Sequence, residues 1–366
     1  MRLIVWDYPH YAIHAGKEVF VDTFVNQFMA RGHEVLFVFE GSRDRKFCQI
    51  ENSPLIKFLE LPEKSTLRSP SLFSTISHAK QAVRDFRPQI LFSQSFFCLS
   101  RLLIDSIMSS EDCDFSQVLF VHNIKDVTKI NLSLANSKSL QNIKKVLSPS
   151  HYIKERLSES PVMNKLQVLP HGSNPISENV AKQKKNHIVF TGRFVIEKGV
   201  LDLLSAWSMI YSVIPDYELF FYGDGPLSTV MKRKITELNI SARTHVVGEL
   251  SRSQISEVLS NSSILVLPSL LPEAFGLSVL EAMNAGLPCI VTDKGALPEL
   301  IRDGLDGLVV PAHHVDALGN AIKKLAEQTD LRNLFGASSK QRVIDNYSLS
   351  ESIERFEATF DELLKI

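Results

Sequence analysis

The sequence has few cysteines, and they lie far apart. Cys48, Cys98, Cys113 and Cys289 are the four in 366 residues, and no two of them have the C-x-x-C spacing of a zinc site. A secreted disulfide framework needs a denser and more regular set of cysteines. We therefore expect four reduced thiols in a cytoplasmic protein.

Long hydrophobic runs are absent as well. The chain has no run of about 18 apolar residues, the length that spans a bilayer. Its first residues, "MRLIVWDYPH", hold only a few apolar side chains before Asp7 and Pro9, too few for the hydrophobic region of a secretory signal. The sequence predicts a soluble, cytoplasmic protein, for which a peripheral contact with the membrane surface stays open.

An excess of charge of either sign is also missing. The chain holds 40 Lys and Arg against 41 Asp and Glu, a net charge of −1, which gives no reason to expect nucleic acid as the main partner. Residues 1–170 hold 21 basic and 17 acidic side chains. This small basic excess suits an anionic or membrane-borne substrate, but it is also typical of an ordinary solvated surface.

The sequence does contain a series of short apolar runs, separated by segments with helical spacing. Continuous apolar strands, each followed by a helix, are typical of parallel sheets covered on both faces. Because a domain takes roughly 100 to 200 residues, we predict an α/β protein with two doubly wound, Rossmann-like domains facing across a cleft. The predicted strands are 2–6, 34–39, 89–93, 117–122 and 145–150, then 187–192, 217–223, 244–248, 263–269 and 288–293.

A polar and basic segment, residues 174–186, separates the two series of strands and shows no periodicity. We interpret it as a linker, with a first domain at residues 1–175 and a second at 176–347. Residues 348–366 are predicted to form a final helix with one apolar stripe, which must pack against another part of the protein. The stripe consists of Ile353, Phe356, Phe360 and Leu363.

Two basic side chains follow the first strand of the second domain. Arg193 and Lys198 come between that strand and the next helix, and Gly192 and Gly199 flank them. Two cations and a helix N-terminus at one point can bind a diphosphate without a metal. Solvated cations on a connecting loop are the simpler alternative, but the two glycines favour the binding site.

Two carboxylates stand out in the apolar stretch of residues 272–293. Glu273 precedes a predicted helix and Glu281 lies within it; eight residues span at most about 12 Å along a helix axis. The pair can therefore bind two ends of an elongated ligand, and a carboxylate that accepts two hydroxyl protons suits a vicinal diol. An amphipathic helix with one solvent-facing glutamate is the alternative. Between them, the N–H groups of Phe275, Gly276 and Leu277 would face a phosphate.

The first domain offers two further candidates. Gly16 stands at the start of the helix that contains Phe20, Phe24 and Phe28, where backbone N–H groups could approach an anion. His122 ends the predicted strand 117–122 and could donate to a sugar hydroxyl or a phosphate. A turn glycine and a structural histidine are the alternatives. For His171, beside the linker, we favour the structural role.

Two other motifs are interpreted as structural. "YGDGP" at residues 222–226 resembles the start of a dinucleotide fingerprint, but Ser228 occupies the third glycine position, so we expect a tight turn that lines the cleft and no nicotinamide site. Asp112 and Asp114 form the D-x-D pair that often binds a divalent metal. Because the pair precedes its strand, it would lie at the wrong edge of the sheet, and we expect no metal site.

Taken in order, these motifs resemble the retaining glycosyltransferases of family four, which have the GT-B fold. "GRFVIEKGVLDLL", "YGDGP" and the long run from "VLPSLLPEAFGLSVLEAMNAGLPCIVTD" to "GLVV" follow the family pattern, most strongly over residues 187–311. The resemblance covers nearly the whole chain. It implies that the last helix crosses back onto the first domain.

The resemblance also implies roles for individual residues. Arg193 and Lys198 match the diphosphate-binding pair, Glu273 the residue that binds the donor sugar, and Glu281 the ribose-binding glutamate. His122 matches a histidine near the transferred sugar, so Arg193, Lys198, Glu273 and His122 are the candidate catalytic residues. The other candidates for nucleotide-sugar binding are Gly16, Leu250, Ala274, Phe275, Gly276 and Leu277.

Three positions depart from the family pattern. Family members often have a second glycine where this chain has Ala15, an asparagine where it has His171, and a tryptophan where it has Leu349. None of these changes removes a charge that the reaction needs. The change at Ala15 bears most on the acceptor side.

The reaction implied is the transfer of a hexosyl group from a nucleoside diphosphate sugar to a hydroxyl of a glycan or glycolipid acceptor. UDP is the favoured nucleotide, no metal or cofactor is expected, and lipopolysaccharide or surface-polysaccharide synthesis in bacteria is the favoured context. A nucleotide-sugar epimerase of the same fold would use the same diphosphate site without a second substrate. A non-catalytic binding protein would not need all of Arg193, Lys198, Glu273 and Glu281.

Overall fold

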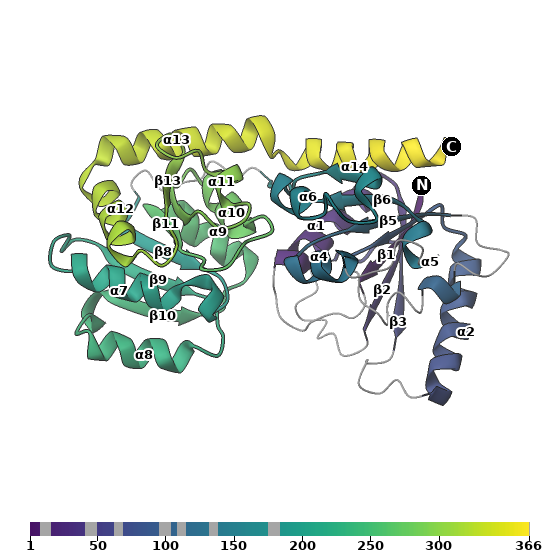
Figure 1. Cartoon of the computed structure of the whole chain (residues 1–366), viewed down its shortest axis with the longest axis horizontal. Helices are drawn as coiled ribbons and strands as arrows, with labels where there is room; N and C mark the ends of the chain where they lie inside the picture. The colour runs from purple at the N-terminus through teal and green to yellow at the C-terminus, as the bar shows by residue number, and fades with distance from the viewer. Residues whose placement is uncertain are drawn as a thin grey trace. The chain divides into compact units, whose positions relative to one another are not determined.

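The computed structural model describes eight ranges of the chain, which are residues 1–7, 16–40, 50–61, 69–94, 104–107, 115–131, 138–174 and 184–365. The chain divides into two compact units. The first unit consists of Met1–Pro170 together with Glu351–Ile366, and the second of His171–Ser350. Each unit is built around one parallel sheet (Figure 1).

The first unit contains a seven-stranded parallel sheet in the order β3-β2-β1-β4-β5-β6-β7. The direction of strand addition reverses between β1 and β4, which is the arrangement of a doubly wound domain. Its strands are β1 Arg2–Asp7, β2 Glu34–Glu40, β3 Ile56–Leu61, β4 Ile90–Ser93, β5 Ser116–Phe120, β6 Ile143–Ser148 and β7 Leu166–Val168. Its helices are α1 Gly16–Ala30, α2 Ser69–Phe86, α4 Ile124–Asn131, α5 Lys138–Gln141 and α6 His151–Arg156, with α14 at Leu349–Leu364.

Helix α14 is held by aromatic side chains of the first unit. Phe356 and Phe360 are fully buried, and their rings lie 5.3 Å from those of Phe24 and Phe92 respectively. At the edge of this cluster, Glu357 accepts a 2.6 Å hydrogen bond from His33. Large aromatic rings contribute most of the apolar area that such a contact buries, so the final helix is part of the first unit's core.

The second unit contains a six-stranded parallel sheet in the order β10-β9-β8-β11-β12-β13. Its strands are β8 His187–Thr191, β9 Glu218–Tyr222, β10 Thr244–Gly248, β11 Ile264–Leu267, β12 Cys289–Thr292 and β13 Gly307–Val310. Its helices are α7 Val200–Ile210, α8 Ser228–Glu237, α9 Arg252–Asn261, α10 Leu277–Asn284, α11 Leu297–Leu300, α12 Val315–Glu327 and α13 Thr329–Asn346, with a short 3₁₀ turn η4 at Ile196–Lys198.

The helices of the second unit lie on both faces of its sheet (Figure 1). Strands are added in one direction from β8 to β10 and in the other from β11 to β13. Because crossovers between parallel strands are right-handed, α7 and α8 fall on one face and α10 and α11 on the other. Helix α12 then packs against α7, and α13 against α10.

The predicted fold class, two doubly wound α/β domains, is confirmed. Three strands were not predicted, namely β3, β7 and β13. Strand β5 ends at Phe120, so His122 lies two residues beyond the strand and not at its last position. Several residues discussed above fall outside the described ranges, namely Ala15, Cys48, Cys98, Asp112, Cys113, Asp114 and most of the linker.

Over the ranges that the structure describes, no helix is both long and apolar enough to cross a membrane.

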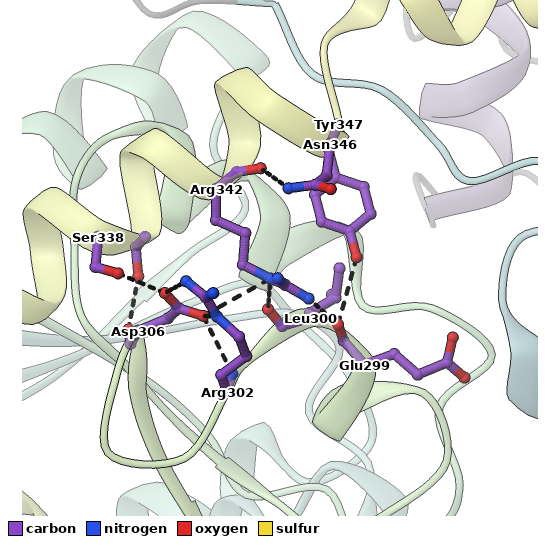
Figure 2. A network of polar contacts seen from close by, with 9 residues as sticks. Glu299, Leu300, Arg302, Asp306, Ser338, Arg342, Asn346 and Tyr347 are labelled. Carbon is purple, nitrogen blue, oxygen red and sulfur yellow. Dashed lines mark hydrogen bonds and ion pairs between the residues drawn. The ribbon is translucent and has the colours of Figure 1, made fainter.

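A buried carboxylate ties α13 to the loop before β13 (Figure 2). The Asp306 side chain is fully buried and accepts two 2.7 Å hydrogen bonds from the Arg302 guanidinium and one of 2.7 Å from Ser338 of α13. From the same helix, Arg342 donates to the carbonyls of Leu300 and Glu299. Burial opposes ionisation, but Arg302 and Ser338 hold the pKa of Asp306 below its ordinary value.

We expect Phe356→Ala to destabilise the first unit by about 3 to 5 kcal/mol, because it leaves a cavity among five phenylalanine rings. Each unit holds one of the chain's two tryptophans, Trp6 in the first and Trp207 in the second. Urea unfolding followed by Trp6 fluorescence in a Trp207→Phe background therefore reports the first unit. Phe73→Ala is the control, because that ring is 73% exposed. An unchanged midpoint for Phe356→Ala would show that α14 does not contribute to this core.

We expect Asp306→Asn to destabilise the second unit by about 2 kcal/mol at pH 7, because it weakens hydrogen bonds made to a charge. Since the folded pKa lies below the ordinary 3.8, this contribution is present in full above about pH 4 and is lost as the pH falls through the folded pKa. Urea unfolding followed by Trp207 fluorescence in a Trp6→Phe background, from pH 7 down to about pH 2, measures it. The control is the exposed Asp216→Asn. A gap between wild type and Asp306→Asn that is unchanged down to about pH 2 contradicts this assignment.

Candidate functional site

The best candidate site in the second unit lies where the strand order reverses, between β8 and β11. In open parallel sheets, ligands bind beyond the carboxyl ends of the strands at this reversal. The loop after β8 carries Arg193 and Lys198, and the loop after β11 carries Ser269 and Glu273. We call these four residues, with the first turn of α10, the switch-point site.

An ion pair joins the two loops of the switch-point site. The Lys198 ammonium donates a 2.7 Å hydrogen bond to Oε1 of Glu273, and the two side chains are 21% and 18% exposed. Burial opposes the charge of Glu273, but Lys198, a hydrogen bond from Ser269 and the charge of Arg193 hold its pKa below the ordinary value. The carboxylate is therefore ionised at neutral pH, ready to accept hydrogen bonds from hydroxyl groups.

Backbone contacts fix the loop that carries Lys198. Gly199 follows the short turn η4 with φ of 67°, in the left-handed region that favours glycine. A Cβ at this position would lie 1.9 Å from the carbonyl oxygen of Pro268, at the end of β11. Leu270 N donates a 2.7 Å hydrogen bond to the carbonyl of Glu197. The two loops are thus held together along their main chains as well as by the ion pair.

The first turn of α10 adds backbone donors to the switch-point site. Gly276 precedes the helix with φ of 110°, and Phe275 before it is 6% exposed. Val279 N and Leu280 N donate to the carbonyl of Gly276, whereas the N–H groups of Leu277 and Ser278, the first two residues of α10, come too early to have an acceptor within the helix. Together with the helix dipole, these groups favour an anion at this end. The structure places Ala274 in the same loop, between Glu273 and Phe275.

Glu281 lies one turn further along α10, and its environment differs from that of Glu273. Burial raises its pKa, against the opposing effect of Arg252. Arg252 is the first residue of α9, two positions after Leu250, whose side chain packs against the unit's core. The β10–α9 loop and Glu281 are therefore close enough to interact, so the predicted base and ribose contacts belong to one region.

The glycine turn after β9 supports the Arg193 loop. Phe194 N donates a 2.8 Å hydrogen bond to the carbonyl of Asp224, and a Cβ on Gly223 would lie 2.0 Å from the carbonyl oxygen of Gly192. The Asp224 side chain accepts from Gly225 N and from Ser228 within its own turn. These contacts confirm the predicted tight turn and show that it packs against the Arg193 loop.

In the first unit, the predicted candidates follow β1 and β5. Helix α1 begins at Gly16. His122 is half-buried, its ring lies 4.5 Å from that of Phe120, and its Nε2 lies 2.8 Å from Oε1 of the fully buried Gln94, which follows β4. The strands β4 and β5 are neighbours, so this hydrogen bond fixes the imidazole at the carboxyl edge of the first sheet.

Sequence reasoning missed an ion pair beside Gly16. Lys17 donates a 2.6 Å hydrogen bond to Asp7, the last residue of β1, whose side chain is 1% exposed. Burial opposes the charge of Lys17, but Asp7 and Glu18 keep its pKa above the ordinary value. The position of Asp7 at the end of the first strand was a signal that could have identified it.

Sequence reasoning also passed over Ser269 in the second unit, although it is the last residue of the predicted strand 263–269. His171, by contrast, takes the structural role expected of it. It is 4% exposed, its ring lies edge-on 4.9 Å from Phe275, and burial lowers its pKa to about 3, so it is neutral at pH 7. No group of three or more His, Cys, Asp or Glu side chains suited to a metal ion occurs among the residues described.

Two family models match consecutive parts of the chain. Residues 15–175 match the model described as Glycosyltransferase Family 4, and residues 174–342 match the model described as Glycosyl transferases group 1. The switch-point site lies entirely within the second match.

Comparisons with individual proteins agree with the two family models. The chain is 26% identical over 216 residues to an Escherichia coli UDP-Gal:alpha-D-GlcNAc-diphosphoundecaprenol alpha-1,3-galactosyltransferase, covering 55% of each protein. It is 24% identical to the Schizosaccharomyces pombe phosphatidylinositol N-acetylglucosaminyltransferase gpi3 subunit, over 91% of this chain and 74% of that protein. For most of the curated relatives that match first, the matching region spans about half of their length.

A solved structure of Anabaena HepE in complex with UDP-glucose superposes on 99% of this chain and on all of that chain, with a TM-score of 0.78 at 14% identity. At that identity the likeness concerns the fold, which is GT-B. With both family models matched in sequence, and with two doubly wound domains as the fold requires, the chain belongs to the glycosyltransferases that combine a family 4 domain with a group 1 domain.

Proposed function

We propose that the protein transfers a hexosyl group from a UDP-sugar to a hydroxyl of a glycan or glycolipid acceptor, with retention at the anomeric carbon. One observation carries this proposal. Arg193, Lys198, Glu273 and the first turn of α10 all lie beyond the carboxyl ends of β8 and β11, where the strand order of the second sheet reverses. This site combines cations and backbone donors suited to a diphosphate with an ionised carboxylate suited to sugar hydroxyls.

Charge stabilisation is the main contribution that we assign to these residues. When the glycosidic bond of the donor breaks, negative charge develops on the leaving diphosphate and positive charge on the anomeric carbon. Arg193, Lys198 and the N–H groups from Phe275 to Leu277 would stabilise the negative charge, and we propose that they do so without a metal ion. Glu281 would bind the ribose hydroxyls at the other end of the donor, and the loop containing Leu250 would contact the base.

Retention needs a proton acceptor for the attacking hydroxyl. Retaining hydrolases place two carboxylates about 5 Å apart, one of them the nucleophile, and nothing in the sequence suggests a comparable pair. We propose instead that the acceptor attacks from the face of the leaving group and that a departing phosphate oxygen takes its proton. In the first unit, His122 and the start of α1 at Gly16 would contribute hydrogen-bond donors to this chemistry.

The name of one relative supports UDP as the nucleotide, and the names of two support a lipid-linked acceptor. The names of two of them specify a UDP-galactose donor with a diphosphoundecaprenol-linked acceptor, and N-acetylglucosamine transfer to phosphatidylinositol. The basic excess of residues 1–170 suits an anionic acceptor of this kind. We therefore favour bacterial lipopolysaccharide or surface-polysaccharide synthesis, at the cytoplasmic face of the membrane.

We expect UDP-sugars to raise the melting temperature of the protein more than GDP-sugars do, because a ligand at 100 times its Kd adds about 2.7 kcal/mol of stability.

Arg193→Gln should weaken UDP binding roughly tenfold, since it removes a charged donor to the diphosphate. Calorimetric titration measures the Kd for UDP of wild type and of Arg193→Gln. The control, Arg233→Gln, changes a side chain of α8 that is 71% exposed. If Arg193→Gln bound UDP as tightly as wild type does, the diphosphate would have to bind elsewhere.

We expect Glu273→Gln to lower kcat/KM for sugar transfer roughly 10- to 100-fold, the cost of losing hydrogen bonds to a charged group. The amide keeps the size of the carboxylate, so the protein should stay folded, but its melting temperature should fall because Lys198 loses its charge partner. Turnover of donor in the presence of the acceptor measures the effect, and Glu257→Gln on the exposed part of α9 is the matched control. Wild-type turnover by Glu273→Gln would exclude the proposed role of Glu273. If the wild-type protein formed an epimerised sugar from donor alone, it would be an epimerase.

A further inference from the structure

Ser269 makes a hydrogen bond that goes beyond what the family match assigns. It is the second residue after β11, it is fully buried, and its hydroxyl donates a 2.5 Å hydrogen bond to Oε1 of Glu273. Lys198 donates to the same oxygen at 2.7 Å. Within the described part of the chain, no hydrogen bond reaches the second oxygen, Oε2. Both donors on the protein side thus hold one carboxylate oxygen and leave the other for a ligand.

The main chain around this hydrogen bond is fixed at both ends. The carbonyl of Ser269 accepts a 2.5 Å hydrogen bond from the hydroxyl of Thr292, at the end of β12, which is 2% exposed. The carbonyl of Glu273 accepts a 2.9 Å hydrogen bond from Ala296 N. Gly295, with φ of 66°, pairs with Glu273 so closely that a Cβ on it would lie 2.2 Å from the Glu273 carbonyl oxygen.

The two donors on Oε1 differ in what else they can do. Lys198 has three N–H donors on a flexible chain. In the proposed function, its ammonium group also interacts with the diphosphate of the donor. The short Ser269 side chain is enclosed, and its hydroxyl donates to Glu273 alone among the residues described. Ser269 can therefore hold the carboxylate in one orientation whether Lys198 contacts Glu273 or a phosphate.

We propose that Ser269 is a positioning residue, which fixes Oε1 of Glu273 so that Oε2 faces the hydroxyl groups of the donor sugar. This inference rests on the proposed function in taking a sugar as the ligand of Glu273. It makes recognition of the sugar, but not of the nucleotide, depend on Ser269.

Ser269→Ala tests the proposal, with Ser263→Ala as the matched control. Ser263 is 3% exposed and donates one 2.6 Å hydrogen bond, but it lies at the opposite end of β11, next to Lys185. Both variants lose one buried hydroxyl from the same strand region, so their melting temperatures should fall to a similar extent. Only Ser269→Ala should alter the carboxylate of Glu273.

The first measurement needs no ligand. Carbon-13 NMR of protein labelled at the glutamate carboxyl carbons, with the Glu273 signal assigned by Glu273→Gln, follows the titration of this group. Because a hydrogen bond to the ionised form lowers a carboxyl pKa, we expect the pKa of Glu273 to rise by about one in Ser269→Ala and to stay unchanged in Ser263→Ala. An unchanged pKa in Ser269→Ala overturns the proposal.

The second measurement compares ligands by calorimetric titration, with UDP-galactose, UDP-glucose and UDP-N-acetylglucosamine against UDP alone. We expect Ser269→Ala to weaken binding of the preferred UDP-sugar about tenfold and to change the Kd for UDP less than twofold. Equal weakening of both ligands, or of neither, overturns the proposal. If wild type binds neither UDP nor any of the three UDP-sugars, the proposed function fails instead, and the NMR titration alone then decides the role of Ser269.

Discussion

The ion pair between Lys198 and Glu273 is the contact on which the switch-point site depends. Two charges that are mostly shielded from water stabilise a fold only when their geometry is good and further hydrogen bonds complete the site. The protein meets this condition by joining the loops after β8 and β11 through their main chains, where Gly199 lies against Pro268 and Leu270 N donates to the carbonyl of Glu197. The loop after β12 adds a further contact, because its Gly295 lies against Glu273. Neither loop could move without breaking both the backbone contacts and the pair.

Much of the fold could be predicted because its central strands are continuous apolar runs. All five strands between residues 187 and 293 were expected within one or two residues. The three that were missed are shorter or half exposed. Strand β3 has exposed Lys57, Phe58 and Glu60, β7 has three residues, and β13 begins with Gly307. Their stability comes from pairing with a neighbouring strand, which a local pattern of apolar residues does not reveal.

The charged residues of the site were easier to predict than the residues that hold them. Arg193, Lys198 and Glu273 stand out because their surroundings are apolar or rich in glycine. Ser269 does not stand out, since a serine after a strand is common in turns and its role depends on a carboxylate four residues later. The same is true of Asp306, whose partner Ser338 is 32 residues away. Such hydrogen bonds follow from tertiary packing, so sequence spacing alone could not predict them.

The ion pair also explains how the switch-point site can keep its charged side chains in place before the proposed diphosphate binds. Without a partner, the largely buried Lys198 would carry the full cost of a desolvated charge, and so would Glu273. Paired, they neutralise each other, and the three donors of the ammonium allow it to keep one bond to Glu273 while another reaches a phosphate. Arg193 is exposed and needs no such partner. The site can therefore hold its charges in place before a ligand arrives, so that little reorganisation is needed when it binds.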